Sequence, residues 1–267
     1  MQRFLLGTNW KMHKNFSEAL DYTAKLRILA EAYPEYQYFI IPPALYLQEL
    51  GKRMAGSLVL LGAQNMHWLD EGDFTGELSP AWIADCGAQI AELGHSERRQ
   101  FYNENDYDLN RKVHAALHYG MRPLLCVGES AQEKMYGITE EVLRRQLKIG
   151  LFGVAPEDAS RVWIAYEPVW AIGASGVPAD PAYVEQVHAV LHDCLVELFG
   201  ERGRGIPVLY GGSVNQENCV ALAERKGVDG LFIGRAAWDM EKFKTISEQL
   251  HAYFNTCLLY TSDAADD

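Results

Sequence analysis

The sequence predicts an α/β fold, a single-domain (β/α)8 barrel of parallel strands. Eight short apolar runs recur along the chain, and helical periodicity follows them. The runs are apolar at nearly every position, which indicates strands that are covered on both faces and joined by right-handed crossovers. No linker or low-complexity segment divides the chain, so one domain is the simpler organisation. An open doubly wound sheet is the alternative, but no GxGxxG motif follows the first run to indicate dinucleotide binding.

The predicted strands and helices alternate along the chain. The strands span residues 4–9 (FLLGTN), 38–41 (YFII), 58–64 (LVLLGAQ), 89–93 (QIAEL), 122–128 (RPLLCVG), 162–166 (VWIAY), 206–210 (IPVLY) and 230–234 (GLFIG). Segments 17–33 and 183–199 carry apolar side chains at the spacing of amphipathic helices. In such a barrel the loops after the C-terminal ends of the strands carry the chemistry, so the candidate site residues are sought there.

Composition limits the classes of partner. The chain has 24 Lys and Arg against 36 Asp and Glu, a formal net charge of −12, and no basic block. This balance disfavours nucleic acids and anionic membranes as partners. No apolar stretch reaches the roughly 18 residues of a membrane span, and no signal peptide is recognisable, so the expected location is the cytoplasm. The five cysteines are scattered and form no CxxC pair, which predicts neither a disulfide framework nor a zinc site.

The last eleven residues are set apart from the predicted domain. We assign residues 1–256 to the barrel and residues 257–267 (CLLYTSDAADD) to a tail that resembles the translation of a sequencing adapter. A natural disordered tail is the alternative, and either origin predicts that this segment lacks structure.

Glu167 ends the sixth predicted strand and begins the segment EPVWAIGASG. A single loop acid before a proline is usually a solvated surface group. Here Pro168 stiffens the exit from the strand, Trp170 offers an apolar anchor, and the small residues within 173–176 make a pliable tip. Such a segment can close over the carboxylate and exclude water. The pattern favours a base that works beneath a lid.

His95 and Lys11 follow the fourth and the first predicted strands. Ser96 is the expected cap of the helix after His95, and the partial positive charge of a helix N-terminus disfavours imidazolium. A neutral His95 can donate a hydrogen bond to a carbonyl oxygen. Lys11 would add a fixed cation at the same C-terminal end of the barrel. Taken singly, a surface histidine and an exposed lysine are the plainer explanations.

Glycine-rich turns end the last two strands, with YGGSVN at 210–215 and IGR at 233–235. Each alone is compatible with a simple tight turn. After strands seven and eight of a barrel, their backbone N–H groups can converge on a phosphate. A base, a neutral donor, a cation and a phosphate cradle are the parts needed to move a proton next to a carbonyl.

The motifs NWKM, GHSERR, CVGE, YEPVWAIG and YGGSV occur in this order over residues 4–254. Together they resemble the triosephosphate isomerase family. The resemblance implies a TIM barrel and an intramolecular aldose–ketose isomerase that needs no metal and no organic cofactor. It implies that Glu167 moves a proton between adjacent carbons, that His95 polarises the carbonyl, and that Lys11, with Asn9 beside it, stabilises the enediolate.

The same resemblance assigns the remaining site residues. Ser96 and Glu97 would orient the site. Main-chain groups would hold the phosphate at Gly173, Gly211, Gly212, Ser213 and Gly234. Segment 65–79 is a long connection that a surface loop explains equally well by composition. In the family this loop docks into a neighbouring subunit with Thr75 near its tip, which implies a homodimer.

Three positions involve the lid or depart from the family pattern. Glu129 is expected to pair with Trp170 when the lid moves. Pro178 lacks the N–H group that a tyrosine matching Tyr210 bonds in the family. Arg235 stands where the family usually has a second glycine, and it would add charge and bulk beside the phosphate.

These observations predict an activity and leave its substrate open. The leading expectation is interconversion of dihydroxyacetone phosphate and D-glyceraldehyde 3-phosphate through an enediolate. The altered lid leaves open the same chemistry on a four-carbon erythrulose phosphate. A sugar-phosphate-binding barrel without turnover is the remaining alternative, although it has no use for Glu167, His95 and Lys11 together.

Overall fold

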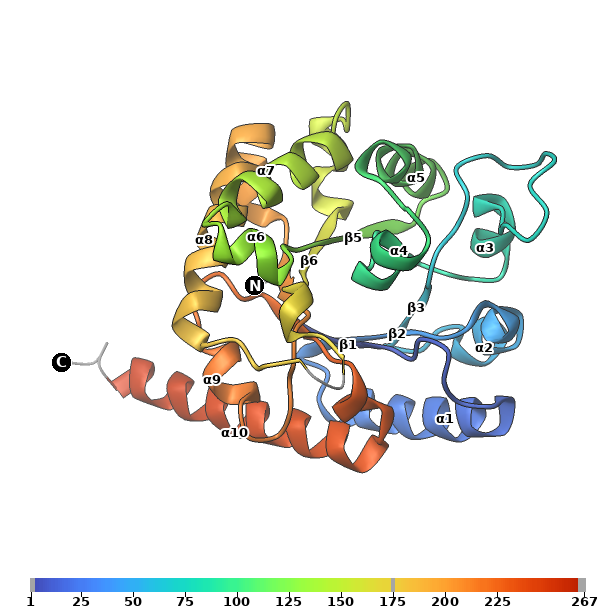
Figure 1. The fold of residues 1–267 in the computed structure, drawn as a ribbon. Coiled ribbons are helices and arrows are strands. Elements are labelled where there is room, and N and C mark those ends of the chain that lie inside the picture. The colour runs from blue at the N-terminus through green and yellow to red at the C-terminus, as the bar shows by residue number, and fades with distance from the viewer. Residues whose placement is uncertain (1–2, 174–175, 264–267) are drawn as a thin grey trace.

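The strands close into one parallel barrel, as Figure 1 shows for the computed structural model, which describes residues 3–173 and 176–263, with side chains to residue 256. The strands are β1 (Phe4–Asn9), β2 (Tyr36–Ile41), β3 (Leu60–Ala63), β4 (Ile90–Leu93), β5 (Arg122–Val127), β6 (Trp163–Tyr166), β7 (Val208–Tyr210) and β8 (Gly230–Phe232). Each strand pairs with the next in sequence, and β8 pairs with β1 to close the ring. The predicted barrel is confirmed. Every strand lies inside its predicted run except β2, which begins at Tyr36 rather than at residue 38.

Helices surround the barrel (Figure 1). They are α1 (Phe16–Ala32), α2 (Leu47–Met54), α3 (Pro80–Asp85), α4 (Ser96–Phe101), α5 (Asp106–His118), α6 (Ala131–Met135), α7 (Thr139–Gly150), α8 (Pro181–Phe199), α9 (Cys219–Ala223) and α10 (Met240–Asp263). None of the described helices is long and apolar enough to cross a membrane.

The strands bury apolar side chains on both of their faces. One cluster fills the barrel interior with side chains that alternate along the strands, such as Phe39 and Ile41 of β2, or Leu124 and Cys126 of β5. A second, larger cluster lies between the outer face of the barrel and the helices. Burial on both faces explains why the strands read as nearly continuous apolar runs.

Two segments extend beyond the barrel and the helices packed on it. Residues 64–79 form no helix or strand and project from the barrel beside α3 (Figure 1), with Thr75 exposed. Helix α10 does not stop at the predicted domain boundary but continues to Asp263. The expectation that the tail lacks structure is therefore wrong for residues 257–263. Adding residues to an existing helix avoids the cost of nucleation, so a helix can propagate past the residues that pack it on the barrel.

Candidate active site

A pocket of about 610 Å³ opens at the C-terminal ends of the strands. It is lined by these predicted site residues: Asn9, Lys11, His95, Glu97, Glu167, Gly173, Gly211, Gly212, Ser213, Gly234 and Arg235. Ser96 reaches the site through its backbone, whereas Thr75 does not line the pocket. The other lining residues include His13, Gln216, Trp238 and Lys242, whose polar side chains the sequence analysis does not assign to the site.

Glu167 is held immediately after β6 by the neighbouring strand. Its N–H donates to the Val127 carbonyl oxygen at 2.7 Å, which continues the β5–β6 ladder by one residue. Gly128 makes this approach possible, because a Cβ atom there would lie 1.9 Å from the Glu167 carbonyl oxygen. The Glu167 residue is only 2% exposed, and its Oε2 accepts a hydrogen bond from the Ser96 N–H at 3.1 Å. The carboxylate is thus buried and aimed at the start of α4.

His95, rather than the predicted Ser96, is the N-cap of α4. Its Nδ1 accepts a hydrogen bond from the Glu97 N–H at 3.2 Å, so the cap comes from the ring, and Ser96 is the first helical residue. Because Nδ1 must keep a lone pair for this bond, we assign the proton of the neutral ring to Nε2. Nε2 lies 3.5 Å from Glu167 Oε1. A neutral donor therefore faces the carboxylate across the pocket.

Lys11 has a left-handed backbone conformation, with φ of 52°, which is uncommon for a residue with a side chain. Its N–H donates to Asn9 Oδ1 at 2.6 Å, and its carbonyl oxygen accepts from Gln64 Nε2 at 2.8 Å. Its Nζ pairs with Glu97 Oε1 at 2.7 Å. Lys11 is therefore fixed through both its backbone and its side chain.

The predicted phosphate end lies after β7 and β8. The Gly212 backbone packs against the Tyr210 side chain. A Cβ atom at Gly212 would lie 2.2 Å from the Tyr210 hydroxyl, so glycine suits this turn. The Asn218 side chain donates to the Ser213 carbonyl oxygen at 3.0 Å and holds the loop. Across the pocket, Arg235 Nη2 donates to the Gly173 carbonyl oxygen at 2.8 Å.

Glu129 anchors the segment that follows Glu167. Its carboxylate is buried and accepts hydrogen bonds from Trp170 Nε1 at 2.8 Å, from the Tyr166 hydroxyl at 3.1 Å and from the Tyr183 hydroxyl at 2.9 Å. The expected contact between Glu129 and Trp170 is thus present. Two residues of the expected lid tip, Ala174 and Ser175, lie outside the described residues.

The Tyr210 hydroxyl, which the sequence leaves without a donor at Pro178, is buried. It makes no hydrogen bond of ordinary geometry within the described part of the chain. Burial raises the pKa of Tyr210, and the backbone N–H of Ala179 acts in the opposite direction. The Ala179 N–H, which follows Pro178, thus acts on the hydroxyl group that lacks the family's donor.

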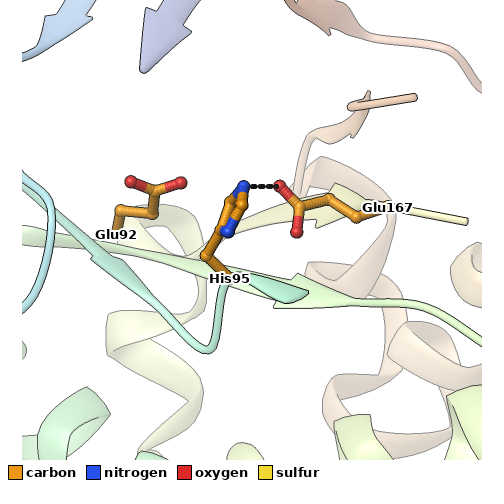
Figure 2. A group of neighbouring side chains, drawn as sticks. All are labelled: Glu92, His95 and Glu167. Carbon is orange, nitrogen blue, oxygen red and sulfur yellow. Dashed lines mark ion pairs between the residues drawn. The ribbon is translucent and has the colours of Figure 1, made fainter. Parts of the chain in front are cut away.

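Glu92 is the buried acid that the sequence reasoning missed. It lies in β4 and is fully buried, and Asn9 Nδ2 donates to Oε1 at 3.0 Å and to Oε2 at 2.7 Å. Figure 2 shows its carboxyl group and that of Glu167 on either side of the His95 ring. Burial, and next the charge of Glu167, raises the pKa of Glu92 well above 4.5, which favours its neutral acid form. The sequence signal for this residue is a single charged residue within the apolar run QIAEL.

One group of described side chains has the composition of a metal site. Ligand atoms of Glu92, His95 and Glu167 lie within 4.8 Å of one another. Both Glu92 oxygens already accept from Asn9, however, and the Lys11 ammonium at the same mouth would repel a second cation. We assign no metal to this group.

The geometry joins a buried carboxylate, a neutral imidazole, a cation and glycine-rich turns around one pocket. Comparison with known proteins points the same way. Residues 4–250 match the sequence model of the family described as triosephosphate isomerase. A solved structure of triosephosphate isomerase from Bartonella henselae is 36% identical and superposes with a TM-score of 0.82, over 91% of this chain and 97% of that one.

Two relatives are named for a different substrate. L-erythrulose-1-phosphate isomerase of Rhizobium etli is 42% identical over 249 residues, which cover 92% of each chain. The enzyme of the same name from Brucella abortus is 40% identical over 248 residues, covering 92% of this chain and 96% of its own. The shared sequence and fold make this chain an isomerase that belongs to the triosephosphate isomerase family.

Proposed function

We propose that this protein isomerises a four-carbon substrate, L-erythrulose 1-phosphate. The observation that carries the proposal is the name shared by relatives that are 40% to 42% identical over nearly the whole chain. The three-carbon reaction, which the motifs alone favoured, becomes the second candidate. The structural similarity to a triosephosphate isomerase supports that candidate. Family membership removes the alternative of a binding barrel without turnover.

The chemistry follows from the substrate and the pocket. In L-erythrulose 1-phosphate the carbonyl is at C2 and the C1 oxygen is esterified, so C3 is the neighbouring carbon with a free hydroxyl. Glu167 would take the C3 proton, and the electron pair of that bond would form the C2–C3 double bond of an enediolate. His95 would donate from Nε2 to the oxygen that gains charge and move a proton between the two oxygens. Return of a proton from Glu167 to C2 leaves the carbonyl at C3.

The phosphate end does not distinguish the two candidates. In both substrates one carbon separates the phosphate oxygen from the carbonyl carbon, so the turns around Gly212 and Gly234 would hold either one. The extra hydroxymethyl group of the four-carbon sugar extends beyond the reacting carbon, on the side away from the phosphate. Discrimination of about 10-fold to 200-fold is the usual range for a group of this size in an apolar pocket.

We also propose that the chain works as a homodimer. Large apolar side chains are exposed in the loop after β1, in segment 65–79, in α3 and at the C-terminal end of α4: Met12, Phe74, Trp82, Phe101 and Tyr102. The Lys11–Glu97 pair brings the loop after β1 beside α4. Exposed apolar side chains on neighbouring segments favour an interface, and Thr75 would dock there with its loop.

The substrate is tested by measuring kcat/KM on L-erythrulose 1-phosphate and on dihydroxyacetone phosphate under identical conditions. We expect the four-carbon sugar to be preferred by at least about tenfold. Preference for dihydroxyacetone phosphate would replace the first candidate by the second. Absence of turnover on both would reject the proposed function.

A further inference from the structure

Glu92 is a fully buried carboxyl group beside the pocket, and the proposed chemistry does not use it. It does not line the pocket, so a substrate would not touch it. A carboxyl group is costly to bury, and an apolar residue would be expected inside a barrel strand. Its hydrogen bonds with Asn9 indicate what role this buried acid has.

The Asn9 side chain has a defined orientation because both of its ends are bonded. Its Oδ1 accepts from the Lys11 N–H at 2.6 Å, which identifies the oxygen end, and its Nδ2 therefore faces the two oxygens of Glu92. Without Glu92, the amide group would lose both partners of its Nδ2 and could rotate. The Glu92 carboxyl group thus holds Asn9 in the orientation that serves Lys11.

Lys11 is the residue that depends on this orientation. A left-handed conformation is strained for a residue with a Cβ atom, and the bond from the Lys11 N–H to Asn9 offsets part of that strain. The same conformation directs the Lys11 ammonium to Glu97 at the pocket wall. A chain of contacts therefore runs from the barrel interior through Asn9 to the cation.

We propose that Glu92 is a positioning residue for the isomerase reaction: it fixes the Asn9 amide, which holds the Lys11 backbone and so places the Lys11 ammonium toward the enediolate. The inference rests on the role given to Lys11 in the proposed function. The turns after β7 and β8 lie outside this chain of contacts, so phosphate binding is independent of Glu92.

Two ligands separate positioning from a general structural role. Inorganic phosphate occupies the cradle alone, whereas 2-phosphoglycolate adds a carboxylate where the enediolate oxygens would develop. For Glu92→Leu we expect the Kd of 2-phosphoglycolate to rise about tenfold while the Kd of inorganic phosphate stays unchanged. The kcat/KM should fall by a similar factor, with most of the loss in kcat. Glu92→Gln retains one acceptor oxygen for Asn9 and should lose less.

Stability provides the second readout. Glu92→Leu leaves the buried Asn9 amide without acceptors for its Nδ2 hydrogens, so its Tm should be lower than that of the wild type, and the Tm of Glu92→Gln, which keeps one acceptor, should lie between the two. Thr8→Val is the matched control, because Thr8 lies next to Asn9 in β1 and its buried Oγ1 has no partner in the described part of the chain. This variant should bind both ligands normally.

The experiment is isothermal calorimetry of the full chain with each ligand, combined with steady-state kinetics. Unchanged 2-phosphoglycolate binding in both Glu92 variants overturns the proposal, and so does an equal loss of affinity for both ligands. Because binding is measured without turnover, failure of the proposed substrate leaves this test intact. Selective loss of 2-phosphoglycolate affinity, smaller for Glu92→Gln than for Glu92→Leu, supports it.

Discussion

Arg235 connects the loop after β8 to the segment after β6 through its bond to the Gly173 carbonyl oxygen. It is exposed and lines the pocket, so its charge is available to a phosphate. We predict that Arg235→Ala raises KM about threefold to tenfold at low ionic strength and changes kcat little, because an exposed cation aids binding more than chemistry. Kinetics at low and high salt test this.

Arg202→Ala controls for the loss of one positive charge, because Arg202 pairs with Glu157 outside the pocket. The Arg235 effect should diminish as salt screens the charge. An Arg235→Ala enzyme with wild-type KM at low ionic strength would show that this guanidinium does not contact the substrate.

The strand-end residues could be placed from sequence because the barrel makes their position predictable. Glu167 and His95 follow strands that their apolar sequences predict, and the ring of parallel strands brings their loops together. Glu92 could not be interpreted in this way, since its meaning comes from Asn9, which lies on a different strand. The left-handed conformation of Lys11 likewise has no sequence signal, because it depends on contacts with Asn9 and Gln64 that form only in the folded barrel.

Helix α8 carries a buried histidine that couples folding to pH. His188 Nδ1 lies 2.8 Å from the Gly227 carbonyl oxygen, and Nε2 has no partner in the described residues. Burial lowers the pKa of His188 to about 4. The unfolded chain therefore takes up a proton near pH 6.5 that the folded chain refuses until about pH 4. Stability is lost as the pH falls between these two values.

We predict that His188 alone removes up to about 3 kcal/mol of unfolding free energy over this interval. In His188→Gln, the curve of stability against pH should be flatter on the acid side. Urea unfolding of both proteins at about pH 7 and about pH 4.5 measures the difference. Parallel curves for the two proteins would mean that His188 is not the group that titrates. His192 and Asp229, which also face this site, are present in both proteins.

At the level of elements, boundaries were harder to predict than identities. Strands buried on both faces give continuous apolar runs, so all eight were found. The cap of α4 was misplaced by one residue because serine is the commoner cap, and only the contact from Glu97 reveals that the His95 ring takes this role. Helix α10 overran its predicted end because its sequence contains no breaker there.

For the whole molecule, the proposed dimer gives a prediction about assembly. Thr75→Arg places a bulky cation at the tip of the loop expected to dock, so the variant should be monomeric at micromolar concentrations and less active. Sedimentation velocity measures the mass, with Thr245→Arg on α10 as control. A wild-type chain that stays monomeric, or a Thr75→Arg chain that remains dimeric, would contradict the proposed interface.

The barrel as a whole brings a carboxylate from the loop after β6 and an imidazole from the loop after β4 to within 3.5 Å of each other. The most direct test of the reaction proposed for this pair is kcat of Glu167→Gln on the substrate that the wild type prefers. Gln keeps the size of the side chain but cannot accept a carbon-bound proton, so we predict a fall of about a thousandfold with the fold intact. A rate within about tenfold of the wild type would contradict the assignment of Glu167 as the base.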